Sequence, residues 1–378
     1  MFISSQFDAG NISVISCVDA LDIQLKIRED RNSEYFQWFY FRLANAKSRS
    51  CRINIVNAAG AAYPEGFKNY RVAYSYNRLD WQRHSTEMES GVLSFNFTPE
   101  SDSVYFAYFA PYSMERHHDL IASTLDSPLC SYSRLGATLD GQDLDLLKFS
   151  LPDHPNSRPN CWFIARQHPG ESMAEWWMEG CIEYLLDREN ESIQKLLNSC
   201  NVYLIPNMNP DGSKRGHLRT NAAGRNLNRE WISPTLEFSP EVFVVKNAMQ
   251  NSGVSFMLDV HGDESLPLCF IAGTEGLSGW SERQQRQLDF YKQNLEKLNP
   301  DFQTRDGYPP KKAGQANMTM STAQTAFQYN CLAMTLEMPF KDTTATPDTV
   351  YGWSPVRSKR LAHSCLDALQ LYLDSGLM

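Results

Sequence analysis

The sequence predicts a two-domain chain in which an antiparallel β-sandwich precedes an α/β domain. Three observations lead to this prediction. Up to about residue 110, the chain contains short β-branched or aromatic runs separated by turn residues, a pattern typical of antiparallel sheets. From residue 113 onward, apolar strands alternate with helical stretches, as in an α/β sheet with helices on both faces. The 378 residues are enough for two domains with a sizeable core.

The first domain is expected to span residues 1–112. Many short strands in a region of roughly this length fit an antiparallel sandwich. The strand-like runs fall at 36–43, 51–56, 72–76, 91–97 and 104–109. Pro111 lies near the break, and residues 113–124 read as a short linking helix.

The second domain, residues 113–378, is expected to hold the α/β sheet. Its apolar strands are predicted at 162–165, 202–205, 256–261 and 331–338, and its longer helices at 171–186, 240–251, 281–298 and 355–373. The chain shows no internal repeat, low-complexity tract or charge run long enough to mark a disordered tail.

His168 and Glu171 stand three residues apart where the strand at 162–165 runs into a helix. Pro169 and Gly170 force a turn, and Glu171 opens the helix. Side chains at the carboxyl end of a strand in an α/β fold face the crevice where ligands bind. A His-x-x-Glu pair alone is often an ordinary helix-surface pair, so it is the setting that predicts a metal site.

His261 is the best candidate for a third ligand. Period-two alternation along residues 256–261 places Asp259 and His261 on one face, with His261 at the strand end. Two histidine nitrogens and one glutamate carboxylate suit Zn²⁺, whose catalytic sites keep three protein ligands and one open position. For His168 alone, the alternative is a hydrogen-bonded structural histidine.

Glu337 is the candidate for a base beside the metal. It lies on the strand 331–338, on the face opposite Leu336. A carboxylate on an otherwise apolar strand is costly unless it is used or paired. A glutamate near a zinc-bound water can take its proton and pass it to a leaving amine. The alternative is an exposed glutamate at a strand end.

A loop rich in turn formers, residues 207–231, concentrates positive charge in a chain whose net charge is −9. Its arginines are Arg215, Arg219, Arg225 and Arg229. Guanidinium groups bind carboxylates through paired, charge-assisted hydrogen bonds, so the cluster indicates an anionic ligand. A solvated loop with internal salt bridges is the alternative.

Five motifs occur in the order and approximate spacing of the zinc carboxypeptidases. They are His168-Pro-Gly-Glu171, Asn209-Pro-Asp-Gly212, Gly224-Arg-Asn-Leu-Asn-Arg229, Asp259-Val-His261 and Thr335-Leu-Glu337. The chain most closely resembles the cytosolic carboxypeptidase subfamily, which includes tubulin deglutamylases and bacterial relatives. The resemblance covers nearly the whole chain. It implies a mixed eight-stranded sheet flanked by helices, preceded by a β-sandwich domain.

The resemblance also implies roles for individual residues. The zinc ligands, for one ion per chain, would be His168, Glu171 and His261, and the general base would be Glu337. The substrate's terminal carboxylate would be held by Asn228 and Arg229, and the scissile carbonyl would be polarised by Arg219. Arg225 is a further candidate for an anion contact, four residues before Arg229.

Two features depart from the wider family. Digestive-type carboxypeptidases carry an arginine immediately before the glutamate ligand, where this chain has Gly170. Those enzymes also have a substrate-capping tyrosine upstream of the base, and residues 311–324 contain none. Neither Tyr308 nor Tyr329 can be assigned that role from the sequence. Ungapped counting back from the base places the floor of the side-chain pocket near Thr322, without a charged residue to fix the preference.

The composition of the chain limits its expected cellular location and the kinds of partner that it can bind. The amino terminus lacks a signal-peptide pattern and no run is apolar enough for a membrane helix, so we expect a cytoplasmic protein that does not bind membranes. Nine cysteines, without a Cys-x-x-Cys pair, are typical of free thiols in a reducing compartment. The acidic balance argues against nucleic-acid binding.

The sequence therefore predicts a zinc-dependent metallocarboxypeptidase that acts on the C-terminal tails of peptides or proteins, with an acidic residue as the first guess for the side chain. One alternative is an N-acyl amino acid hydrolase of the aspartoacylase and succinylglutamate desuccinylase type, although the β-rich N-terminal region argues against it. A second is a non-catalytic protein that binds acidic tails. The N-terminal domain could also bind a partner by itself.

Overall fold

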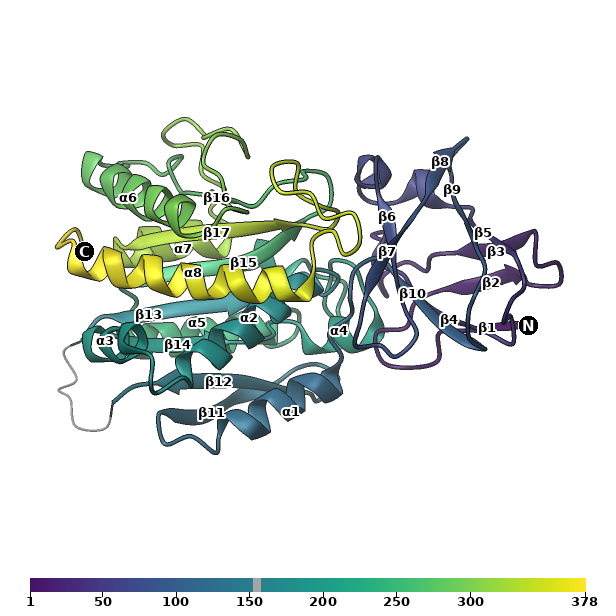
Figure 1. Cartoon of the computed structure of the whole chain (residues 1–378). Helices are drawn as coiled ribbons and strands as arrows, with labels where there is room; N and C mark the ends of the chain where they lie inside the picture. Colours follow the sequence, from purple (N-terminus) through teal and green to yellow (C-terminus); the bar gives the residue numbers. More distant parts are fainter. Residues whose placement is uncertain (152–157) are drawn as a thin grey trace.

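The chain folds into a smaller β-rich region and a larger region of one sheet covered by helices (Figure 1). The computed structural model describes residues 1–151 and 158–378. The two regions meet end to end, and strands β15 and β17 of the larger region point toward the smaller one (Figure 1). The carboxyl ends of these strands therefore lie near the junction.

The smaller region is a pair of five-stranded sheets, which confirms the predicted sandwich. The first sheet has the order β1 (Phe2–Ser4), β4 (Tyr40–Ala44), β10 (Ser103–Ala107), β6 (Arg71–Ser75), β7 (Gln82–Ser85). The second has the order β2 (Ser13–Ser16), β3 (Ile23–Lys26), β5 (Cys51–Ile55), β9 (Val92–Phe97), β8 (Glu87–Glu89). Neighbouring strands pair antiparallel, except that β3 and β5 run parallel.

Aromatic side chains from both sheets fill the space between them. The ring of Phe106 on β10 lies 5.5 Å from Phe41 on β4 and 5.1 Å from Phe95 on β9, measured between ring centroids. All three are buried. Because alternate residues of a strand point to one face, each strand contributes its inward positions to this core.

The first predicted strand, 36–43, is only half a strand in the structure. Strand β4 begins at Tyr40, so residues 36–39 lie outside the sheet. The buried Gln37 side chain donates to the carbonyl of Tyr63 at 3.0 Å and accepts from its backbone N–H at 2.8 Å. Near residues 36–39 the Gln37 side-chain amide thus makes the hydrogen bonds that a neighbouring strand would otherwise make. The run of aromatic residues in the sequence gives no sign of this.

The larger region is built on a mixed sheet of seven strands in the described residues, one fewer than the resemblance implied. Its order is β11 (Cys130–Ala137), β12 (Asp143–Phe149), β14 (Asn201–Ile205), β13 (Asn160–Ala165), β15 (Phe256–Asp263), β17 (Leu332–Pro339), β16 (Phe270–Ala272). The four central strands run parallel, and β11, β12 and β16 are antiparallel. Strands β15 and β17 are buried along their whole length, as expected of parallel strands covered on both faces.

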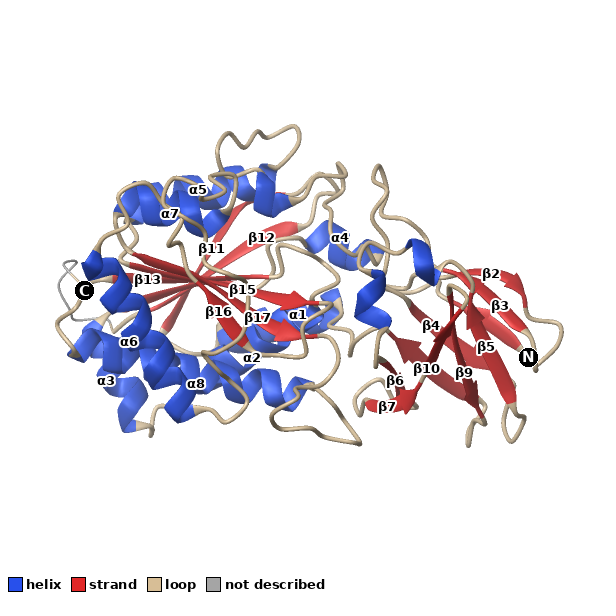
Figure 2. Cartoon of the chain, turned by 90° about the horizontal axis from the view of Figure 1, so that it is seen from above, coloured by secondary structure: helices blue, strands red, loops and turns tan. Residues whose placement is uncertain are grey.

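Helices cover both faces of this sheet (Figure 2). One face carries α2 (Ser172–Leu185), α3 (Glu191–Ser199), α6 (Glu282–Leu298) and α8 (Pro355–Asp374), and the other α5 (Pro240–Ser252) and α7 (Ser321–Tyr329). The remaining helices are α1 (Met114–Thr124), α4 (Pro210–Arg215) and the short 3-10 turns η1 (Ala58–Gly60), η2 (Pro64–Phe67) and η3 (Leu227–Arg229). No helix of the described residues is both long enough and apolar enough to cross a bilayer.

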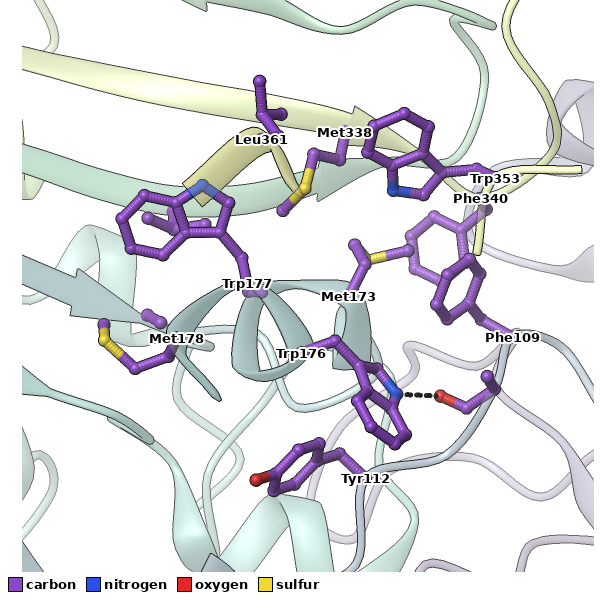
Figure 3. Close-up of a cluster of buried hydrophobic side chains, with 14 of the residues drawn as sticks. Phe109, Tyr112, Met173, Trp176, Trp177, Met178, Met338, Phe340, Trp353 and Leu361 are labelled. Carbon is purple, nitrogen blue, oxygen red and sulfur yellow. Dashed lines mark hydrogen bonds between the residues drawn. The ribbon is translucent and has the colours of Figure 1, made fainter. Parts of the chain in front are cut away.

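Helix α2 is buried because it packs against the sheet and the N-terminal region (Figure 3). Met173, Trp176 and Trp177 lie within the apolar cluster drawn there. The indole of Trp176 donates a hydrogen bond at 3.0 Å to the carbonyl of Ala110, in the segment joining the two regions. The start of α2, which follows the predicted metal motif, is thereby held by contacts with both regions.

Candidate metal centre

The predicted metal motif occupies a tight turn between β13 and α2. Glu171 is the residue immediately before α2, as the Pro-Gly turn predicts. The N–H of Gly170 donates to the carbonyl of Leu218 at 2.9 Å. A Cβ at position 170 would lie 2.9 Å from that carbonyl oxygen and 3.1 Å from the Leu218 Cα. Glycine is therefore needed at this position because another backbone segment passes against it.

His168, Glu171 and His261 converge in a buried cluster, with one donor atom of each within 4.8 Å of the others. The Nδ1 atom of His168 lies 2.6 Å from Oε1 of Glu171, and Nδ1 of His261 lies 2.8 Å from Oε2. The two Nδ1 atoms are 3.2 Å apart. Two zinc ligands at bonds of ~2.0–2.1 Å in tetrahedral geometry are spaced by about 3.3 Å. The 3.2 Å between the two Nδ1 atoms matches this spacing, and two imidazoles with one carboxylate are a donor set that suits Zn²⁺.

The opposite nitrogen of each histidine is held by a polar side chain. Nε2 of His168 lies 3.0 Å from Oδ1 of Asn226, and Nε2 of His261 lies 3.0 Å from Oδ2 of Asp259. Protons on the Nε2 atoms leave the Nδ1 lone pairs free for a metal, as in many histidine sites oriented by outer partners. The sequence motifs contain Asn226 and Asp259, but spacing alone did not predict this orienting function.

The surroundings of the cluster keep His168 and Glu171 in metal-binding protonation states. Burial alone would lower the pKa of His261, but Asp259 and Glu171 raise it well above its ordinary value, so zinc would displace a proton there. Burial and the nearby Arg219 guanidinium lower the pKa of His168 to about 4, so its imidazole is neutral at physiological pH. Burial alone would raise the pKa of Glu171, but His168 and His261 lower it below its ordinary value. A neutral imidazole and an ionised carboxylate are the forms that coordinate zinc.

Glu337 lies beside the cluster because β17 pairs with β15, where it is the direct partner of His261. Its side chain is buried, and Oε2 has no hydrogen-bond partner among the described residues. Burial raises the pKa of Glu337 well above its ordinary value, and the nearby carboxylates of Glu171, Asp263 and Glu264 add to this. A carboxylate with a raised pKa holds a proton more strongly, which suits a base.

A cleft of about 1330 Å³ opens over these groups. Seven of the eight predicted site residues line it: His168, Glu171, Arg219, Asn228, Arg229, His261 and Glu337. Thr322, the predicted floor residue, also lines the cleft, and its hydroxyl lies 3.5 Å from that of Thr335. Its wall also contains four basic residues that the sequence analysis did not assign: Lys292, Arg305, Lys311 and Lys312.

Arg225, the eighth predicted residue, lies outside the cleft. The anion contact predicted for it is therefore not found among the residues that line the cleft. Its side chain is exposed, and its guanidinium lies over the ring of Phe238 at 4.8 Å, outside the cleft. Arg215 likewise forms a salt bridge with Asp140 at 2.6 Å. Of the four arginines in the loop, only Arg219 and Arg229 reach the cleft.

Tyr308 is the tyrosine that the structure brings to the base. Its hydroxyl donates to Oδ2 of Asp263 at 2.5 Å and lies 3.4 Å from Oε1 of Glu337. Tyr329 ends α7 and does not line the cleft. Only the turn formers Gly307 and Pro309 on either side mark Tyr308 in the sequence, so the sequence favoured neither tyrosine.

Comparison with known families and structures gives matches along nearly the whole chain. The zinc carboxypeptidase family model matches residues 119–359, and the model of the cytosolic carboxypeptidase N-terminal domain matches residues 3–109. An uncharacterized protein of Zymomonas mobilis is 48% identical over 373 residues, covering 98% of this chain and 96% of its own length. Cytosolic carboxypeptidase 6 of Caenorhabditis elegans is 29% identical over 364 residues, covering 89% and 78%.

Solved structures agree with this match. A metallo-carboxypeptidase from Pseudomonas aeruginosa, in complex with (2-guanidinoethylmercapto)succinic acid, is 42% identical, with a TM-score of 0.97 and 100% of both chains covered. A metallo-carboxypeptidase from Burkholderia cenocepacia is also 42% identical, with a TM-score of 0.97 and 99% of both chains covered.

Proposed function

Because this chain belongs to the zinc carboxypeptidase family, we propose that it removes C-terminal residues, preferably acidic ones, from peptides or protein tails. The observation that carries the proposal is the convergence of the metal-ligand cluster, a buried base and two arginines in one cleft. One zinc ion per chain would be held by His168, Glu171 and His261. Bound there, zinc would polarise the scissile carbonyl and lower the pKa of a water molecule.

Asn228 and Arg229 are proposed to anchor the terminal carboxylate of the substrate. Both line the cleft, and the Asn228 amide oxygen is held by the N–H of Ser321 at 3.0 Å. The Arg229 guanidinium is exposed to the cleft, and within the described part of the chain it makes only one hydrogen bond, at 2.6 Å to the Asn228 carbonyl. Its remaining N–H groups are free to bind a carboxylate, which would fix the last peptide bond against the cluster.

Arg219 and Glu337 would carry out the two remaining tasks. The guanidinium of Arg219 lies near the metal cluster, and although burial alone would lower its pKa, the neighbouring Tyr63, Glu264 and Glu171 raise it. It therefore stays charged and can stabilise negative charge that develops on the scissile carbonyl oxygen. Glu337 would accept a proton from the attacking water and transfer it to the departing amine.

The preference for acidic residues is proposed from the charge of the cleft wall. Lys292, Arg305, Lys311 and Lys312 line the cleft, as do the acidic residues Asp263, Glu264, Glu275 and Asp306, so an acidic side chain would have to bind beside the four basic residues. The predicted floor near Thr322 is polar but uncharged, so attraction for an acidic side chain would come from the wall. Opposite charges in a partly enclosed cleft interact more strongly than on an open surface.

We also propose a cytoplasmic location. All nine cysteines are free, and most of them are buried, which fits a reducing compartment. The similarity to cytosolic carboxypeptidases points to the same compartment. Acidic tails of other proteins are therefore the substrates that the enzyme would meet there.

Product analysis by mass spectrometry tests the proposal. The zinc-loaded protein is incubated with peptides that differ only in the C-terminal residue, alongside matched peptides with an amidated C-terminus. We expect stepwise loss of terminal residues, fastest for Glu and Asp, and little cleavage of the amidated set.

Glu337→Gln is the control for this experiment, because it removes the base and retains the side-chain shape. We expect it to keep zinc and to lose roughly 10²–10⁴-fold in turnover. Cleavage of N-acyl amino acids with no peptide cleavage would instead favour the aspartoacylase-type alternative. Tight binding of acidic peptides without any cleavage would favour a non-catalytic tail-binding protein.

A further inference from the structure

The N-terminal sandwich domain reaches the cleft of the larger region. Tyr63, which precedes the η2 turn of the sandwich, lines the cleft together with Arg219. Asp30 of the same domain is buried, with 2% of its surface exposed, against residues 218–220. The loop that carries Arg219 is thus covered by residues nearly two hundred positions away in the sequence.

The carboxylate of Asp30 accepts four hydrogen bonds from this loop. Its Oδ1 accepts from the backbone N–H of Leu218 at 2.6 Å. Its Oδ2 accepts from the N–H groups of Arg219 and Thr220 at 2.8 and 2.9 Å, and from the Thr220 hydroxyl at 3.0 Å. Three successive N–H groups directed at one carboxylate fix the backbone on both sides of Arg219, since hydrogen bonds to a charged group are strong.

Two tyrosine rings of the sandwich face the guanidinium of Arg219. The Arg219 Cζ atom lies 5.4 Å from the ring centroid of Tyr63 and 5.8 Å from that of Tyr35. Among the described residues the guanidinium makes no ion pair within 4 Å, so these rings are its nearest oriented partners. Cation–π contacts of this kind restrict the orientation of an arginine without occupying its hydrogen-bond donors.

The same loop supports the metal-binding turn. The Leu218 carbonyl accepts from the N–H of Gly170, between the predicted ligands, at 2.9 Å. His217, at the start of the loop, accepts from the N–H of Arg31 at 3.0 Å through Nε2, and its Nδ1 lies 2.9 Å from the Thr220 carbonyl. Hydrogen bonds of side chains and backbone therefore connect the sandwich, through residues 217–220, with the turn that carries the proposed ligands.

We propose that the sandwich domain is a working part of the active site, in which Asp30 positions Arg219 and the rings of Tyr35 and Tyr63 orient its guanidinium. The inference rests on the proposed function, because Arg219 acts on the scissile carbonyl there. Asp30 is a positioning residue: it contacts the backbone of the loop and acts through Arg219. Loss of Asp30 should thus reduce turnover with little change in substrate binding.

A double-mutant cycle tests this inference. The variants are Asp30→Ala, Asp30→Asn, Arg219→Ala and Asp30→Ala combined with Arg219→Ala, all full-length and zinc-loaded. Because displacement of a positioned group by about 1 Å can cost 10²-fold, we expect Asp30→Ala to lower kcat by roughly 10–100-fold, with KM within about twofold of wild type. In the Arg219→Ala background the same change should cost less than about twofold.

Asp8→Ala is the matched control. Asp8 also belongs to the sandwich and accepts a backbone N–H of the larger region, that of Met114 at 2.7 Å, and among the described residues it makes no hydrogen bond with residues 217–220. It should lower thermal stability without changing kcat per zinc-loaded molecule. Equal and additive losses of kcat for Asp30→Ala and Asp8→Ala would overturn the inference, since both would then act only through domain packing.

Hydrogen–deuterium exchange supplies a measurement that does not depend on activity. Asp30→Asn preserves the size of the side chain but replaces an acceptor by a donor, so the amides of residues 218–220 and of Gly170 should exchange at least about tenfold faster than in wild type. Unchanged exchange would overturn the positioning role even if the protein cleaved no peptide. If the wild-type protein cleaved no peptide but Asp30→Asn still exchanged faster, the proposed function would be rejected, while the positioning of residues 218–220 by Asp30 would stand.

Discussion

His117 links two buried carboxylates beneath the metal-binding turn, and its protonation should control stability at alkaline pH. Its Nδ1 lies 2.6 Å from Oε1 of Glu175 and its Nε2 lies 2.9 Å from Oδ2 of Asp145. The other oxygen of Glu175 accepts from Arg166 at 2.5 Å, and Arg166 also donates to the carbonyl of Pro169 at 2.9 Å. This chain of contacts connects His117 with the turn that carries the ligands.

The direction of the pH effect follows from the pKa of His117. Burial alone would lower it, but Glu175 and Asp145 raise it from 6.5 to about 9. A group with a raised folded-state pKa contributes its full stabilisation below its unfolded pKa, near 6.5, and loses it as the pH rises through 9. The shift corresponds to about 3 kcal/mol, and for a chain of this length to about 4 °C in Tm.

Thermal unfolding of the zinc-loaded protein between pH 6 and 10 measures this contribution. Wild type should lose about 4 °C more than His117→Gln over that range, because glutamine can donate a hydrogen bond to one carboxylate but cannot titrate. The variant should start from a lower Tm at pH 6. Parallel pH curves for the two proteins would refute the reasoning, since they would show that His117 has the same pKa in the folded and unfolded chains.

Three further changes test the site itself. His261→Ala should bind less than one zinc per chain by elemental analysis; stoichiometric zinc would remove His261 from the ligand set. Arg229→Ala should raise KM for free-carboxylate peptides by roughly 10–100-fold, the loss of a charged hydrogen bond, and leave amidated peptides unaffected; an equal effect on both would mean that Arg229 is structural. Gly170→Ala should cost about 1–3 kcal/mol and reduce zinc affinity, because its Cβ would press on Leu218; unchanged Tm and zinc content would contradict the close approach.

The sequence was enough to predict that the metal-ligand cluster comes together, because a small number of physical rules determine where its residues lie. Parallel strands end at the same edge of a sheet, so ligands at the ends of β13 and β15 must lie close together. Alternation along each strand assigned His261 and Glu337 to the face opposite the apolar residues, and the observed register makes the two direct partners. Local motifs and strand periodicity were therefore sufficient for these residues.

The arginines show where sequence patterns fail. Arg219 and Arg225 stand six residues apart in the same loop, yet of the two only Arg219 reaches the cleft. The difference comes from tertiary contacts: Asp30 holds the backbone around Arg219, whereas Arg225 lies over Phe238. Neither partner lies within a few residues of its arginine, so no local pattern could predict which guanidinium faces the cleft.

Gly170 lies where the turn before α2 meets the loop that the sandwich holds in place. The sequence marked it as a departure from digestive-type carboxypeptidases, which carry an arginine at that point. In the structure a side chain there would collide with the Leu218 backbone, and that backbone is held in place by Asp30 of the sandwich. The missing arginine and the added domain are thus linked physically, because the space beside the ligand turn is occupied by a loop that the sandwich fixes.

The domain division that we place at residue 112 therefore describes secondary structure better than it describes function. The buried guanidinium of Arg83, in the sandwich, donates to the carbonyls of Phe340 and Trp353 at 2.8 and 3.2 Å. Phe340 directly follows β17, the strand that carries Glu337. Separating the regions would replace these hydrogen bonds to a charged donor, each worth about 1.5–3 kcal/mol, with hydrogen bonds to water. Contacts from the sandwich thus reach both the loop of Arg219 and the strand of Glu337, so the geometry of the proposed site rests on contacts between the two regions.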